Sequence, residues 1–271
     1  MKKAMMVGLG QVLLLTAMGR LSTSQVSGIN PEALIERIVA VDAKQRSEVS
    51  DVTFDAEYIE GKRQEDGSLK EDRRFIKKVY IKYLPDTAWY AEEFLEFQKG
   101  GEVKPEAECE KEAAKFVEKR KARKTRNISY PLLNPFYPQQ RASYNIAYEG
   151  VAEEVIEGYT CHYFRVTAKE KQSDLLNGQY YFEAETFNLV KVEFSPAQLT
   201  KKTMFKLKRL DMTIVYGPTP EGYWLPRSFE ADGSGKAAFF IGVQFAASEV
   251  FSNPRVNTGI PDDLFEVKDD K

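Results

Sequence analysis

Residues 144–194 read YNIAYEGVAEEVIEGYTCHYFRVTAKEKQSDLLNGQYYFEAETFNLVKVEF. Tyr144, Ile146 and Tyr148 alternate with polar or small residues, so they would share one face of a strand. The same period of two recurs in two later runs: His162, Phe164, Val166 and Ala168, then Val190, Val192 and Phe194. Alternation interrupted by Glu-Gly and Asn-Gly turns is typical of consecutive antiparallel strands with one buried face. This stretch therefore predicts an antiparallel β-sheet.

The composition limits the classes of function. A chain of 271 residues fits one domain of all-β or mixed type or at most two small domains, and 42% hydrophobic residues are enough for a sizeable core. The formal net charge of −2 gives no global basic field that would recruit nucleic acid or anionic lipid. The single histidine, His162, excludes histidine-rich metal sites. We therefore expect neither a metal nor another cofactor.

Residues 1–24 have the pattern of a cleaved signal peptide. Lys2 and Lys3 precede an apolar run over residues 4–19, and small residues then offer cleavage sites. The alternative is an N-terminal membrane anchor. Gly8, Gly10 and other residues interrupt the run, which is shorter than the roughly 20 apolar residues of a membrane span. We expect an exported protein.

Export makes the two cysteines worth weighing, because an oxidising compartment permits disulfides. Cys109 lies in a predicted helix and Cys161 in a predicted strand, so their separation cannot be read from the sequence. A Cys109–Cys161 disulfide and two separate thiols both remain open.

A helix is predicted to open the mature chain and to run to about Arg46. Asn30, Pro31 and Glu32 supply an N-cap residue, a proline at the first helical position and an acid in the first turn. Leu34, Ile35, Ile38 and Val41 then form an apolar stripe at helical spacing. We expect this stripe to pack against the sheet.

Further strands are predicted on both sides of the central stretch, and no βαβ rhythm separates them. They cover residues 52–58, 75–84, 87–97, 204–216, 223–229, 237–245 and 246–256. Turns are expected at Asp66-Gly67, Pro85-Asp86, residues 217–222 and residues 232–235. The predicted fold class is mainly β (α+β), with about ten to eleven antiparallel strands arranged as a meander.

Residues 105–138 differ in character from the rest of the chain. Residues 105–126 begin with acids and end with bases, which matches the dipole of a helix. The helix is either solvated and weakly packed, or its basic end attracts an anionic head group. Three prolines then interrupt the apolar run 130–138, which is either a lid over a cavity or a loop pinned to the core.

Several turn motifs resemble one known family. They are EGYTC at 157–161, GQYYFE at 178–183, EFSP at 193–196 and YGPTPEGYWLP at 216–226. In this order they are similar to the outer-membrane lipoprotein-sorting proteins, the LolA-like periplasmic lipoprotein carriers. The resemblance covers residues 29–265 as one domain, with 105–138 as an insertion and 266–271 as a charged tail.

The resemblance implies a curved antiparallel half-barrel in the periplasm, with helices covering its concave side and a hydrophobic cavity for acyl chains. A strand arginine is associated with opening and closing in the family, and Arg73 and Arg74 lie in the corresponding region. Alternation selects residues that would line such a cavity or form a dry core instead. They are Phe54, Tyr58, Val79, Ile81, Trp89, Tyr144, Ile146, Tyr148, Phe164, Val192, Met212, Ile214, Leu225, Phe229, Phe239 and Ile241.

Three functions compete at this point. The first is a carrier for a lipidated protein or another amphiphile, without a stable membrane span and without nucleic acid. The second is a protein-interaction or sensor module that docks envelope proteins through the helix at 105–126. The third, a hydrolase, lacks support, since the sequence has one histidine, no Gly-x-Ser-x-Gly elbow and no metal-ligand motif. The sequence favours the carrier and predicts no catalytic residue.

Overall fold

A computed structural model describes residues 30–64, 66–84, 87–122, 127–128, 134–199, 201–202, 205–237 and 241–265. The predicted signal peptide, the Pro85-Asp86 turn, Phe239 and the charged tail at 266–271 lie outside the described residues.

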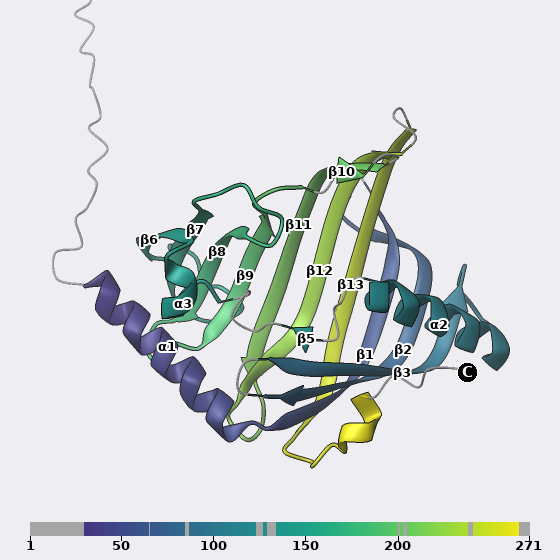
Figure 1. Cartoon of the computed structure of the whole chain (residues 1–271), viewed down its shortest axis with the longest axis horizontal. Helices are drawn as coiled ribbons and strands as arrows, with labels where there is room; N and C mark the ends of the chain where they lie inside the picture. The colour runs from purple at the N-terminus through teal and green to yellow at the C-terminus, as the bar shows by residue number, and fades with distance from the viewer. Residues whose placement is uncertain are drawn as a thin grey trace, which may run out of the picture.

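One antiparallel sheet forms the body of the molecule (Figure 1). Its strands are β1 (Asp51–Arg63), β2 (Leu69–Tyr83), β3 (Ala88–Lys99), β4 (Glu102–Val103), β5 (Asn127–Ile128), β6 (Tyr144–Val151), β7 (Cys161–Ala168), β8 (Leu176–Glu183), β9 (Leu189–Pro196), β10 (Lys201–Lys202), β11 (Phe205–Pro218), β12 (Trp224–Ala237) and β13 (Ile241–Val256). The order is β4-β3-β2-β1-β13-β12-β11-β9-β8-β7-β6, with β5 beside β3 and β10 beside β11. The sheet is not closed, so the predicted mainly β half-barrel is confirmed.

The first and last long strands pair in the middle of this sheet. Val52 on β1 lies opposite Val256 on β13, and the pairing continues to Gly61 and Ala246. A simple meander would have left β1 near one edge, so the predicted order is wrong at this point. Alternation reports which face a side chain takes, but it does not report which strand lies alongside.

Two predicted turns are strand instead. Residues 232–235 belong to β12, and Asn177-Gly178 belongs to β8. Gly233 is required by packing, because a Cβ at this position would lie 2.1 Å from the ring of Phe245. A glycine inside a strand can thus mark a close approach of another side chain rather than a turn. The Glu157-Gly158 turn is confirmed, with φ values of 50° and 90°.

Helix α1 (Pro31–Glu48) begins and packs as the sequence predicts. The Asn30 side chain accepts a hydrogen bond of 3.0 Å from the backbone N–H of Glu32. Leu34, Ile35 and Ile38 are buried in a core with aromatic residues of β7 and β8. The Gln45 side chain bonds both the N–H and the C=O of Trp224, which ties the end of α1 to β12.

Helix α2 (Glu106–Ala122) is anchored more firmly than a solvated helix would be. Cys109 is buried with Phe75 and Phe97. The ring of Phe116 makes edge contacts with Tyr58 and Phe75, with centroids 5.5 and 5.0 Å apart. These contacts correct the expectation of weak packing. The helix has few apolar residues, but the aromatic rings of β1 and β2 pack against those that it has.

The proline-rich segment is pinned to the core at its end, before the short helix α3 (Pro138–Arg141). Phe136 is fully buried and packs edge-on against Phe164, Tyr180 and Phe182. Residues 129–133, which the lid alternative also involves, lie outside the described residues.

Both long helices cover the same face of the sheet, which we call the inner face. Figure 1 shows α1 in front of the β6–β9 half and α2 in front of the β13–β1–β2 half. In the part of the chain that the structure describes, no helix is long and apolar enough to cross a membrane.

Candidate ligand-binding surface

An apolar strip runs along the inner face on β11, β12 and β13, between the two helices. Cross-strand pairs place Ile214 beside Phe229, then Met212, Ala231 and Ala247 in one row, then Leu210, Gly233 and Phe245 in the next. We call these eight residues the apolar strip. All of them except Gly233 are partly exposed. Figure 1 shows the upper lengths of β11 and β12 without either helix in front of them.

The packing on the strip follows from its small residues. Gly233 and Ala231 are consecutive inner-face positions on the central strand, and the Phe245 ring lies over Gly233. Small side chains on a central strand extend less far from the sheet than the larger side chains on the two neighbouring strands. The strip is therefore a shallow apolar surface. Its small residues on β12 lie between Leu210 and Met212 on β11 and Phe245 on β13.

One border of the strip is the core beneath α1. Tyr144, Phe164, Tyr180 and Val192 are buried there against α1, and Ile214 packs at the margin of this core. The strip is thus continuous with a dry core on the β9 side, but it extends beyond that core.

The other border is a buried charge cluster. Lys77 on β2 is fully buried, and its ammonium contacts the carboxylates of Glu92 on β3 and Glu249 on β13. The Lys77 nitrogen lies 5.0 Å from the centre of the Tyr58 ring, and the Tyr90 hydroxyl donates a hydrogen bond of 3.0 Å to Glu92. A buried charge must be paired, and the two carboxylates pair the ammonium, although Oε1 of Glu249 has no hydrogen bond beside this ion pair.

Arg73 joins the sheet to helix α2. Its guanidinium lies 2.7 Å from Glu60 on β1 and 3.5 Å from Glu112 on α2. Arg74 instead pairs with Glu57 and Glu71. Of the two arginines that the sequence offered, Arg73 is therefore the one that contacts the helix.

The predicted cavity residues lie in several different surroundings. Phe54, Val79, Leu225, Tyr144, Phe164 and Val192 are buried in cores, and Ile81, Tyr58, Ile146 and Tyr148 are partly buried against them. Trp89 contacts Phe265, with ring centroids 5.7 Å apart. Met212, Ile214 and Phe229 lie on the strip, Ile241 is 51% exposed near the end of β13, and Phe239 lies outside the described residues.

Sequence reasoning missed Leu210, Ala231, Gly233, Phe245 and Ala247 as strip residues. Leu210 and Phe245 continue the alternation of their strands, which was the available signal. Small residues such as Ala231 carry too little hydrophobic weight to be selected by periodicity alone.

The histidine and the cysteines are parts of cores. His162 is buried, with Nδ1 3.0 Å from the Tyr148 hydroxyl and its ring stacked on Phe187. Burial and the positive charge of Arg37 lower the pKa of His162. Cys109 and Cys161 are free, buried thiols, so the two cysteines form separate thiols and not a disulfide in this structure.

A depression of about 430 Å³ lies on the opposite, outer face. Its lining includes Thr167, Asn177, Ser195 and Thr213, which are polar. An acyl chain needs apolar walls. We therefore take the apolar strip, and not this depression, as the candidate site.

Comparison with solved structures finds several that are similar to this chain over most of its length. The chain is similar to an outer membrane lipoprotein-sorting protein domain from Vibrio parahaemolyticus, with 11% identity, a TM-score of 0.44 and coverage of 85% of this chain and 97% of that one. It is also similar to a DUF1329 family protein from Desulfovibrio piger (13% identity, TM-score 0.44, 87% and 96% coverage). A LolA superfamily protein from Nitrosomonas europaea matches with 10% identity, a TM-score of 0.41 and coverage of 88% and 98%.

Two of these neighbours, the lipoprotein-sorting domain and the LolA superfamily protein, carry the names of the family that the turn motifs resemble. At such identities and TM-scores no residue role is carried over from the LolA-like structures to this chain. No protein-family model and no curated protein sequence matches the chain.

Proposed function

We propose that this protein is a periplasmic, carrier-like binding protein that holds an acyl chain or another amphiphile on the apolar strip. The observation that carries the proposal is the partial exposure of Met212, Phe229 and Phe245 on a helix-flanked inner face. An apolar surface with such a border is a candidate ligand site.

The dimensions of the strip suit an acyl chain. From Phe229 on the strip to Gly235, in the row of Leu207 and Val243 that continues it, β12 extends about 20 Å, at about 3.3 Å per residue. A chain that spans one leaflet of a bilayer needs about 15 Å. Burial of each methylene contributes about 0.8 kcal/mol, so a long chain would gain enough to offset the loss of its own freedom.

Helix α2 supplies a movable cover in this proposal. The guanidinium of Arg73 links Glu112 on α2 to Glu60 on the sheet, beside the apolar contacts of Cys109 and Phe116. Release of these contacts together would let α2 shift without unpairing any strand. Residues 1–24 would direct the chain to the periplasm and be removed there.

Native mass spectrometry of protein purified from a membrane-containing host tests the proposal. The expected result is a complex whose excess mass is that of a lipid and which loses this mass in organic solvent. A protein that is always free of lipid, with a second protein co-purifying instead, would favour the interaction module.

A further inference from the structure

Three strands extend beyond the rest of the sheet and form an arm. β9 pairs with β11 only from Met212 to Val215, and β1 pairs with β13 only as far as Ala246. Residues 205–210, 233–237 and 241–245 continue past these points, and of the other described strands only the two-residue β10 pairs with them. We call these residues and β10 the arm, which projects at the top of Figure 1.

The arm is strongly basic in a chain whose net charge is negative. It carries Lys201, Lys202, Lys206, Lys208, Lys236 and Arg209, and no aspartate or glutamate. Lys206, Lys208 and Lys236 are exposed. A local field of one sign on a protein of the opposite net sign indicates a surface for a partner of opposite charge.

Two of these lysines also lie where they repel one another. Lys206 on β11 is directly opposite Lys236 on β12. Like charges directly opposite one another in a sheet destabilise it. An anionic partner would remove this repulsion.

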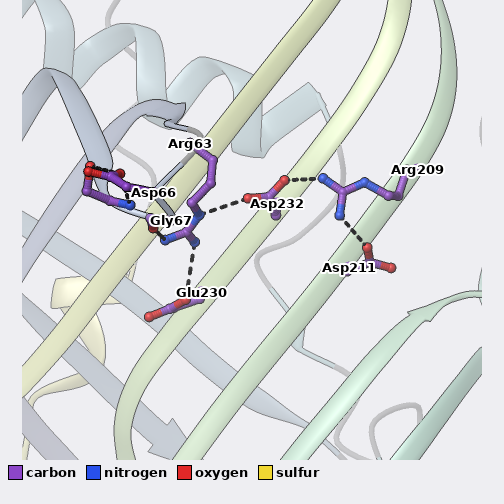
Figure 2. Close-up of polar contacts among 8 residues, drawn as sticks. Arg63, Asp66, Gly67, Arg209, Asp211, Glu230 and Asp232 are labelled. Carbon is purple, nitrogen blue, oxygen red and sulfur yellow. Dashed lines mark hydrogen bonds and ion pairs between the residues drawn. The ribbon is translucent and has the colours of Figure 1, made fainter.

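The nearest acids are already occupied at the base of the arm. Figure 2 shows Asp232 between two arginines: the guanidinium of Arg63 lies 3.0 Å from Asp232, and that of Arg209 contacts its other oxygen. Arg209 also pairs with Asp211, and Arg63 with Glu230. Among the described residues, Lys206, Lys208 and Lys236 make no ion pair, so their charges remain available.

The two faces of the arm differ in polarity. Lys206 and Lys236 lie on the outer face, whereas Leu207, Gly235 and Val243 form a row on the inner face. Ile241 is 51% exposed at the start of β13 and lies on the same side as Val243. The apolar side continues the apolar strip to the tip.

We propose that the arm docks on the surface of an anionic phospholipid bilayer. The lysines would lie at the head groups and Ile241 would enter the interfacial layer, as in other amphipathic membrane-surface elements. The exposed apolar end favours a bilayer over a nucleic acid, which would use the lysines alone. This docking does not depend on the strip holding a ligand.

Vesicle co-sedimentation of the exported chain tests the proposal. Binding is expected to vesicles of phosphatidylethanolamine with phosphatidylglycerol, to weaken as salt is added, and to be absent with phosphatidylcholine alone. Lys206→Gln/Lys236→Gln should bind the anionic vesicles about thirtyfold more weakly. This factor corresponds to about 1 kcal/mol for each lysine near the membrane surface, with about tenfold in affinity per 1.4 kcal/mol. The matched control, Lys111→Gln/Lys171→Gln, removes two other exposed lysines and should bind within about twofold of the parent.

A second pair of variants tests the apolar contact. Ile241→Ser should weaken vesicle binding, whereas Val155→Ser, at a position that is 65% exposed far from the arm, should not. Equal binding of both lysine variants, or equal binding to neutral and anionic vesicles, would overturn the proposal. Binding to duplex DNA but not to vesicles would overturn it in favour of a nucleic-acid surface. Urea midpoints establish that each variant folds. If a variant does not fold, the salt dependence of vesicle binding by the parent protein tests the proposal instead.

Discussion

The ammonium of Lys77 on β2 lies 2.7 Å from the carboxylate of Glu249 on β13, although β1 runs between the two strands. Ala56, the β1 residue opposite Lys77, has a small side chain that leaves room for this contact. Glu92 on β3 completes a cluster that links three strands across the inner face. The cluster lies where the apolar strip ends, since Glu249 is directly opposite Phe229 of the strip.

Removal of the Lys77 ammonium should lower the free energy of unfolding far more than removal of an exposed lysine. Lys77→Met leaves Glu92 and Glu249 buried without their cation, and we expect a loss of about 3 to 5 kcal/mol in the free energy of unfolding. Lys44→Met removes an exposed pair with Glu48 at 3.9 Å and should cost about 0.5 kcal/mol or less. Urea denaturation measures both.

The triple variant Lys77→Met/Glu92→Gln/Glu249→Gln is the decisive control for this cluster. It removes the unpaired charges and should recover most of the lost stability. A single Lys77→Met variant as stable as Lys44→Met would contradict the account of the cluster.

Stability should fall in mild acid because of His162. Burial and Arg37 lower the pKa of His162 in the folded protein below that of the unfolded chain. The unfolded state therefore binds the proton more readily, and stability is lost as the pH falls below about 6.5 toward the folded pKa. Urea midpoints of the parent and of His162→Gln, measured between about pH 7 and pH 5, should diverge. The parent should show the steeper loss; parallel curves would mean that His162 does not titrate in this range.

Local opening of α2 should depend on one aromatic side chain. Phe116→Ala removes ring contacts with Tyr58, Phe75 and Phe94, and we expect a cost of about 2 kcal/mol, which falls mainly on the helix. Hydrogen exchange should accelerate over residues 106–116 and remain slow in β1 and β13. Lys111→Ala, on the exposed side of α2, should leave the stability and the hydrogen exchange unchanged. Equal acceleration across the sheet would show that α2 cannot open separately.

Much of the fold could be predicted because its strands alternate cleanly. Ile146 and Val166 are directly opposite each other on the inner face, as their period implied. The pairing of Val52 with Val256 could not be predicted, since many strands have the same pattern and the pattern does not specify a partner. The helix α1 was predictable because Asn30 and Pro31 give an explicit start signal.

The candidate site was less accessible to sequence reasoning. Periodicity placed Phe164 and Met212 on the same face, but one is fully buried and the other is partly exposed. The difference arises from α1 and Phe136, which cover the first position and not the second. Lys77 lies on an apolar face of β2, and its burial depends on acids from two other strands that alternation does not pair with it.

The binding of an acyl probe by two matched carboxylate variants tests the central claim most directly. Ala231→Glu places a charge between Met212 and Ala247 on the strip, whereas Ser228→Glu places the same charge on the outer face of the same strand. With urea midpoints showing that all three proteins are folded, we predict that the parent and Ser228→Glu bind a fluorescent fatty-acyl probe equally. Ala231→Glu should bind at least about tenfold more weakly, which corresponds to about 1.4 kcal/mol. A parent that binds no probe, or equal binding by both variants, would contradict the assignment of the strip as an amphiphile site.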